Sequence, residues 1–298
     1  MFSIVMPTFN NLQYLKLCVE SLKKNSSFNN ELIIHVNEGT DGSFEYVKQN
    51  QIDHTYSKVN IGLCSAVNIA AKKATTKYIL YTHDDMYFCP GWDKVLKDEL
   101  EKLDNNLFYL SASMIEKNSG HIKFDCGNDF NDFDEKKLLD NQKELKSKDF
   151  QGSHWAPHLI HKEIWDKVGG FSEEFYPGTG SDPDLNMKLW KTGVRIFKGI
   201  NDFKVYHFGS VVTRKYKDNP NLTTETGSRG GKIFLLKWGI SIKFFKKFIM
   251  QSDTKYLGAL SNPKKNVNYL VNIIINKIYY FYVKYIYNYN NKHELINK

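Results

Sequence analysis

Short apolar runs alternate with amphipathic segments along the first 115 residues. The runs at 2–6, 32–36, 78–82 and 108–115 are apolar without strict alternation, which predicts strands buried on both faces. Between them apolar residues recur at helical spacing, as in Leu12, Leu15, Val19 and Leu22. Strands that alternate with helices in this way predict a Rossmann-like, doubly wound and mostly parallel α/β sheet.

The pattern changes after residue 115. Residues 125–149 show no periodicity and read as a surface excursion, whereas 151–160, 194–197 and 203–208 read as strands. Asp182 precedes Pro183 and is expected to be the N-cap of a helix. Two segments rich in aromatic residues and lysine, 234–250 and 267–289, predict a C-terminal helical appendage.

Polar side chains gather where the predicted strands end. The clearest case is His83-Asp84-Asp85, which directly follows the run 78–82. In open α/β sheets ligands bind at the carboxyl ends of the strands. Adjacent carboxylates repel each other unless a cation lies between them, so this stretch is a candidate metal and ligand site. A solvated turn whose Asp caps the next helix is the alternative.

Six short motifs, in order, resemble family 2 glycosyltransferases with the GT-A fold. They are Pro7-Thr8-x-Asn10, Asn37-Glu38-Gly39-Thr40-Asp41-Gly42, Asn60-x-Gly62, His83-Asp84-Asp85, and Asp182-x-Asp184-Leu185 followed by Tyr206-His207-Phe208-Gly209. The resemblance covers roughly residues 1–240. It implies a GT-A domain over 1–232, with a nucleotide-binding half at about 1–110 and an acceptor half at about 111–232, and then a helical region over 233–298.

The resemblance also implies roles for individual residues. The donor, a nucleoside diphosphate sugar, would be bound by Pro7, Thr8, Asn10, Glu38, Asp41, Asn60, Gly62, His83 and Asp84. A metal, Mn²⁺ or Mg²⁺, would be held by Asp85 and His207. His83 stands where the family often has Asp or Asn, and an imidazole among the ligands favours Mn²⁺. For Glu38 a solvated turn, and for His207 a place in the core, are the alternatives.

On the acceptor side the resemblance implies that Asp182 is the catalytic base. Asp184 matches the second acid of the family pattern, and Ser181 replaces its usual Glu. A base is needed because a sugar hydroxyl is a weak nucleophile until its proton is removed. Trp155 is a candidate for stacking on a sugar ring, although an ordinary core position is favoured for it.

Composition narrows the class of partner. The net charge of +8 and the pI near 9.0 favour an anionic partner, but no run of basic residues resembles a nucleic-acid arm. The four cysteines lack C-x-x-C spacing, which indicates free thiols in a reducing compartment. We find no signal-peptide pattern and no long apolar window, so we expect a cytoplasmic protein, with peripheral membrane contact or homodimer formation through its C-terminal helices left open.

Together these features predict a metal-dependent, inverting glycosyltransferase of the hexosyltransferase type, active in polysaccharide biosynthesis. Its acceptor would be a hydroxyl of a glycan or of a lipid-linked glycan. The first alternative is a catalytically inactive sugar-binding or scaffolding module with the same fold. The second is a nucleotidyltransferase, which needs a Gly-rich, basic N-terminal loop that Pro7-Thr8-Phe9-Asn10 does not provide.

Overall fold

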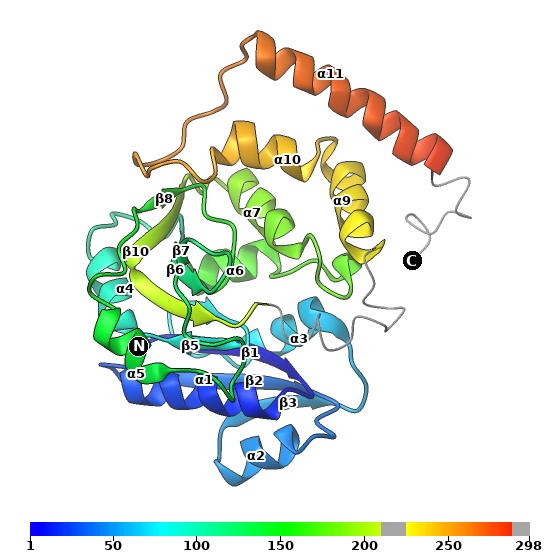
Figure 1. Ribbon diagram of the computed structural model, residues 1–298. Helices are drawn as coiled ribbons and strands as arrows, with labels where there is room; N and C mark the ends of the chain where they lie inside the picture. The colour runs from blue at the N-terminus through cyan, green and yellow to red at the C-terminus, as the bar shows by residue number, and fades with distance from the viewer. Residues whose placement is uncertain (210–224, 288–298) are drawn as a thin grey trace.

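The structure, a computed structural model, describes residues 1–209 and 225–287. A mixed β-sheet forms its centre, helices pack against the sheet, and the C-terminal helices extend from one end (Figure 1). The central strands β1, β2, β4 and β6 are largely buried because they are mostly apolar on both faces, as the sequence predicts, whereas the edge strand β3 has no buried residue. Phe2, Val5, Ile33 and Leu80, for example, are fully enclosed.

The sheet has the order β3-β2-β1-β4-β9-β6-β10-β5. Strands β3, β2, β1 and β4 are parallel, whereas β9 runs antiparallel to both β4 and β6. Strand β10 is parallel to β6, and β5 is antiparallel to β10. The strands are β1 (Ser3–Phe9), β2 (Glu31–Asn37), β3 (Asp53–Ser57), β4 (Tyr78–Tyr81), β5 (Met86–Phe88), β6 (Phe108–Glu116), β7 (Ile122–Lys123), β8 (Phe150–Gln151), β9 (His158–His161) and β10 (Ile196–His207).

Several strands of the sheet differ from the prediction. The region expected to hold two strands, 194–197 and 203–208, forms the single long strand β10, with an irregularity between Ile200 and Lys204. The segment expected as one strand over 151–160 is divided into β8 and β9, and the chain turns away from β8 at Gly152, which has a φ of 66°. Strand β5 was not predicted because it is only three residues long.

The first helices agree closely with the apolar periodicity of the sequence. The unpatterned stretch 125–149 contains one short helix, α5, whose N-cap Asp134 accepts a hydrogen bond from the Lys137 amide. The helices up to residue 191 are α1 (Leu12–Asn25), α2 (Ser43–Gln49), α3 (Gly62–Ala71), α4 (Trp92–Leu100), α5 (Glu135–Asn141), α6 (Lys162–Val168), the 3₁₀ helix η1 (Glu173–Phe175) and α7 (Ser181–Lys191).

The C-terminal part is helical, as expected. Helix α9 (Glu225–Trp238) crosses the expected domain boundary at 232. It is followed by α10 (Ile242–Phe244), the π-helical turn η2 (Phe245–Met250), α11 (Val267–Phe281) and a second π-helical turn, η3 (Tyr282–Tyr287). In the part of the chain that the structure describes, no helix combines the length and the apolar character that a membrane crossing requires.

Candidate functional site

The acidic stretch lies at the carboxyl end of β4, beside the end of β1. Asp84 is buried there and accepts hydrogen bonds from Thr8 Oγ1 at 2.6 Å and from Asn11 Nδ2 at 3.1 Å. Burial and the adjacent Asp85 raise the pKa of Asp84 to about 7. Asp84 therefore joins the first loop to the acidic loop, and Thr8 is occupied in holding it.

Asp85, His83 and His207 form a group with the geometry of a metal site. One ligand atom from each residue lies within 4.8 Å of the other two. His207 Nε2 is 3.6 Å and His83 Nδ1 is 3.9 Å from Asp85 Oδ1. Antiparallel pairing of β5 with β10 produces this arrangement, because His207 pairs with Met86, the residue after Asp85. One carboxylate and two imidazoles are a donor set that fits a divalent cation. Asp85 and His207, the two metal ligands expected from the sequence, lie close together, and their role as ligands stays a prediction.

Glu116 orients His207 from the opposite side. Its Oε1 atom is 2.6 Å from His207 Nδ1, so Nε2 faces Asp85. Burial lowers the pKa of His207, but Asp85 and Glu116 together outweigh burial and bring it to about 10. A carboxylate that fixes the ring of a histidine ligand is a common feature of metal sites. Sequence reasoning missed Glu116 because it ends an apolar strand 91 residues before its partner.

Asp182 lies in the first turn of α7, and the expectation that it is the N-cap is wrong. Gly180, with a φ of 89°, occupies that position, and the helix begins at Ser181. The Asp182 side chain is partly exposed, but its Oδ1 atom is inaccessible and has no hydrogen-bond partner among the described residues. Desolvation raises the pKa of Asp182 to about 7. A carboxylate with a pKa near neutrality is well suited to accept a proton.

Tyr81 lies beside His83, and the charges of both acidic sites affect its phenol. It is the last residue of β4, and its ring lies 5.4 Å from that of His83 and 5.0 Å from that of His158. Burial raises the pKa of Tyr81 well above its usual range, and the charges of Asp182 and Asp85 both add to this rise. The phenol is therefore within electrostatic reach of both carboxylates. Sequence reasoning missed Tyr81 because an aromatic residue in an apolar run looks like ordinary core.

The loops expected to bind the donor hold one another in place. Pro7 pairs with His35 inside the sheet, and Asn10 and Glu38 both have a positive φ. Asn10 Nδ2 donates to Glu38 Oε2 at 3.3 Å, and the Asn60 amide donates to Glu38 Oε1 at 3.2 Å. Three motifs that are far apart in the sequence therefore meet at Glu38.

Two residues of this region have local structural roles. The carboxylate of Asp41 accepts hydrogen bonds from the Leu12 amide at 2.7 Å and from Ser43, which ties the start of α1 to the second loop. Gly62 has a φ of 80°, and a Cβ at this position would come within 2.5 Å of the Tyr176 ring. A side chain larger than hydrogen is therefore excluded at the start of α3.

Asp184 and Trp155, the two residues expected on the acceptor side, are both buried. Asp184 is fully buried and receives hydrogen bonds from Ser172 Oγ at 2.6 Å and from Trp238 Nε1 at 2.8 Å, with Lys237 Nζ at 2.9 Å. Trp155 is 8% exposed and donates to the Ala112 carbonyl at 2.7 Å. Both placements argue against the acceptor-side roles expected from the sequence, since neither side chain has free surface for a ligand.

Replacing Asp184 with Ala should therefore lower the stability of the fold. The substitution leaves Ser172 and Trp238 without their hydrogen-bond acceptor and Lys237 without this buried counter-charge. We therefore expect a loss of about 3–5 kcal/mol in the free energy of unfolding. Chemical denaturation monitored by circular dichroism measures this loss. Asp166→Ala is a matched control, because Asp166 forms an exposed i,i+4 pair with Lys162 whose loss should cost under about 0.5 kcal/mol. Equal effects of the two substitutions would contradict the anchoring role of Asp184.

Comparison with known proteins decides the family. The sequence model of Glycosyl transferase family 2 matches residues 3–161. The chain belongs to this family. The family 2 segment includes the loops expected to bind the donor, the acidic stretch and Glu116, and it ends at the last residue of β9.

Curated relatives of this family 2 chain are known. An uncharacterized glycosyltransferase of Rickettsia typhi is 28% identical over 127 residues, which are 41% of this chain and 39% of the relative. Another, of Rickettsia conorii, is 30% identical over 129 residues, 41% of this chain and 21% of the relative. Each match thus spans less than half of this chain and less than half of the relative.

Solved structures share the fold at low sequence identity. A crystal structure of S. aureus TarS 1-349 in complex with UDP-GlcNAc has a TM-score of 0.54 and 14% identity, covering 95% of this chain and 81% of that one. A crystal structure of GalNAc-T7 with UDP, GalNAc and Mn²⁺ has a TM-score of 0.56 and 16% identity, covering 99% of this chain and 58% of that one. These likenesses confirm the GT-A fold expected from the sequence.

Proposed function

We propose that this family 2 chain is a metal-dependent, inverting glycosyltransferase. It transfers a hexosyl group from a nucleoside diphosphate donor to a hydroxyl of a glycan or lipid-linked glycan. The observation that carries the proposal is that Tyr81 is coupled to both acidic sites. Its ring lies 5.4 Å from that of His83, a member of the Asp85, His83 and His207 group, and the charge of Asp182 raises the pKa of the same phenol.

The donor nucleotide would bind to the loops that meet at Glu38. A carboxylate accepts hydrogen bonds from the ring N–H of a base or from ribose hydroxyls, and Asn10 and Asn60 keep this one oriented. Asp84 fixes these loops to the acidic stretch through Thr8. Asp85, His207 and His83 would hold Mn²⁺ or Mg²⁺, which supplies positive charge to the diphosphate as it leaves.

Asp182 would act on the acceptor. Its carboxylate takes the proton of the acceptor hydroxyl while the hydroxyl oxygen forms a bond to the anomeric carbon of the donor sugar. The bond from that carbon to the diphosphate oxygen breaks on the opposite side, and the electron pair leaves with the diphosphate. Attack from the opposite face inverts the configuration. Among the described residues Oδ1 has no hydrogen-bond partner, which supports this role, because a carboxylate committed to helix capping would have one.

Nucleotide binding tests the donor half of the proposal. UDP, GDP, dTDP and CMP are each added to the protein with and without Mn²⁺, and the melting temperature is measured. A nucleotide at about 100 times its Kd stabilises the folded state by about 2.7 kcal/mol, which corresponds to a rise of about 5 °C. We expect one nucleoside diphosphate to give this rise, and to give it only with the metal. No shift with any nucleotide would contradict the proposal and favour a module without donor binding.

A further inference from the structure

The C-terminal helix α11 has an unusual distribution of polar and apolar residues. Val267, Val271, Ile274 and Ile278 follow one another at three- and four-residue steps, which puts them on one face of the helix. Their exposed fractions are 76%, 48%, 57% and 66%. Ile275 and Phe281 flank them and are also exposed, and Tyr282 and Tyr285 carry the same surface into η3. We call this surface the apolar face of α11.

The opposite face of α11 contacts the rest of the protein. Asn276, about two and a half turns after Val267, is buried, and its Oδ1 atom accepts a hydrogen bond from the Ser241 amide at 2.6 Å. We call α11 and η3 together the arm. At its end, Lys232 lies 3.9 Å over the ring of Tyr287, the last residue of η3. A helix on a water-soluble surface normally buries its apolar side and exposes its polar side. In α11 the polar Asn276 faces the protein, whereas the apolar stripe of Val267, Val271, Ile274 and Ile278 faces outward.

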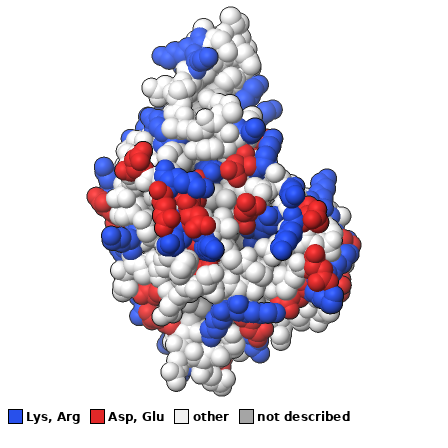
Figure 2. Space-filling model, turned by 90° about the vertical axis from the view of Figure 1, so that its left-hand side faces the viewer, with Lys and Arg blue, Asp and Glu red and all other residues white. Residues whose placement is uncertain are grey.

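The charges around the apolar face have one sign. From Lys255 to Tyr287 the chain has five lysines and no acidic residue. Lys277 directly precedes Ile278 in α11, and Lys284 lies one turn beyond Phe281. Figure 2 shows the same distribution: the end of the molecule that carries α11 is white and blue, with red side chains appearing only nearer the sheet.

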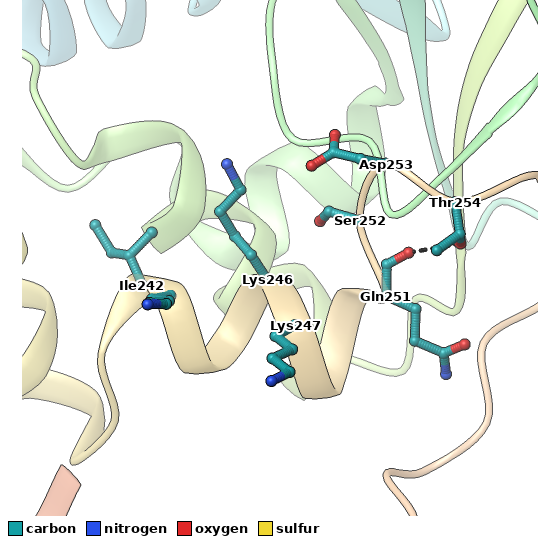
Figure 3. A pocket seen from close by; sticks show the side chains of 8 residues that line it. Ile242, Lys246, Lys247, Gln251, Ser252, Asp253 and Thr254 are labelled. Carbon is teal, nitrogen blue, oxygen red and sulfur yellow. Dashed lines mark hydrogen bonds between the residues drawn. The ribbon is translucent and has the colours of Figure 1, made fainter. Parts of the chain in front are cut away.

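A second group of lysines lies on the neighbouring helix. Lys243, Lys246 and Lys247 line a pocket at α10 and η2 whose other wall is the segment 251–254, where Asp253 is the one acidic residue of the lining (Figure 3). Phe244 and Phe248 of the same helix contact Tyr269 of α11, with ring centroids 5.2 and 5.6 Å apart. The lysine pocket therefore adjoins the start of the arm.

We propose that α11 and η3 lie in the surface of an anionic lipid bilayer, parallel to it, with the apolar face inserted among the acyl chains. An apolar stripe bordered by lysine and rich in tyrosine is the pattern of helices that bind in the plane of a membrane. A second copy of this chain fits less well, because its own arm would bring more lysine and no acidic partner. The proposal does not depend on the catalytic activity proposed above.

Vesicle binding tests this proposal with the full chain. Co-sedimentation is measured with vesicles of phosphatidylcholine alone and with an equimolar mixture of phosphatidylcholine and phosphatidylglycerol. We expect binding to the mixed vesicles, weaker binding to the neutral ones, and a decrease as salt is added, because lysine attracts the anionic headgroups. Protein that stays in the supernatant with both kinds of vesicle would overturn the proposal.

Two sets of variants separate insertion from simple charge attraction. Ile278→Glu removes an inserted side chain and should lower the partition coefficient about 10-fold. The matched control is Val59→Glu, whose side chain is exposed to 64% compared with 66% for Ile278 but lies far from the arm in the sequence. Lys277→Glu with Lys284→Glu should lower binding to the mixed vesicles by about 10-fold or more. The control double variant, Lys143→Glu with Lys146→Glu, changes two exposed lysines of the segment 125–149 and should leave binding to the mixed vesicles nearly unchanged.

Equal binding of Ile278→Glu and Val59→Glu would overturn the proposal, because the apolar face would then have no part in binding. Sedimentation equilibrium can give a second contrary result. If the wild type forms a dimer and binds no vesicles, and the double variant Ile274→Glu with Ile278→Glu is a monomer, this face binds a second copy of the chain. Both isoleucines are more than half exposed, so these variants should keep the wild-type circular dichroism spectrum.

Discussion

Replacing Asp182 with Asn should lower kcat by about 10²–10⁴-fold while donor binding stays near its wild-type level. The amide has nearly the same shape as the carboxylate but cannot take the proton of the acceptor hydroxyl. Transfer is measured with the donor identified by nucleotide binding, and the Kd for its nucleotide is measured in parallel. Asp166→Asn, at an exposed position of α6, is the control and should keep full activity. Full turnover of Asp182→Asn would exclude Asp182 as the base.

The pH dependence of turnover should identify the same group. Desolvation raises the pKa of Asp182 to about 7, and only the ionised form can act as base. The value of kcat should therefore rise about tenfold per pH unit below that pKa and level off above it. In Asp182→Asn this rise should be absent from the residual activity. A residual rate that keeps the wild-type profile would mean that another group titrates.

Replacing Asp85 with Ala should remove the dependence on metal and most of the activity. The substitution takes away the carboxylate around which His83 and His207 gather. A metal ion that stabilises a leaving diphosphate contributes several kcal/mol, so its loss should lower kcat by about 10³-fold. Mn²⁺ titration by calorimetry and transfer assays after treatment with EDTA measure the two effects.

The fold of Asp85→Ala should survive, since His207 keeps its contact with Glu116. Circular dichroism checks this point, and His207→Ala gives a second route to the same loss. Asp104→Ala, at an exposed position, is the control and should bind Mn²⁺ as the wild type does. Retained Mn²⁺ binding in both Asp85→Ala and His207→Ala would place the metal elsewhere.

The predicted residues of the donor and metal side share one property: most of them lie where strands end. Residues of the parallel strands β1, β2 and β4 reach the same edge of the sheet, so their terminal motifs could be grouped from the sequence. Asp85 was found in this way. Its proximity to His207 followed from the family resemblance, and the structure supplies the physical cause in the three-residue strand β5, which is too short to detect by periodicity.

The residues that sequence reasoning missed, or placed differently, depend on long-range contacts. Glu116 becomes informative only when β6 and β10 pair and bring it to His207. Asp184 matches a family motif, but its environment is set by Trp238, 54 residues later, which turns an expected ligand contact into a buried anchor. The hydrophobic pattern and the motifs of the sequence thus indicate which residue types lie near the site. Long-range packing decides which of these side chains remain accessible to a ligand.

The contact between Asp184 and Trp238 also limits how this protein can be divided. The Asp184 carboxylate belongs to the same helix as Asp182, and two of its three partners, Lys237 and Trp238, lie at the far end of α9, beyond the boundary expected at 232. A chain cut at that boundary would lose both the indole and the ammonium group and would expose a charge that the uncut chain keeps neutralised. Truncations and chimeras should therefore be joined after Trp238, and a shortened enzyme that fails to fold would say nothing about its chemistry.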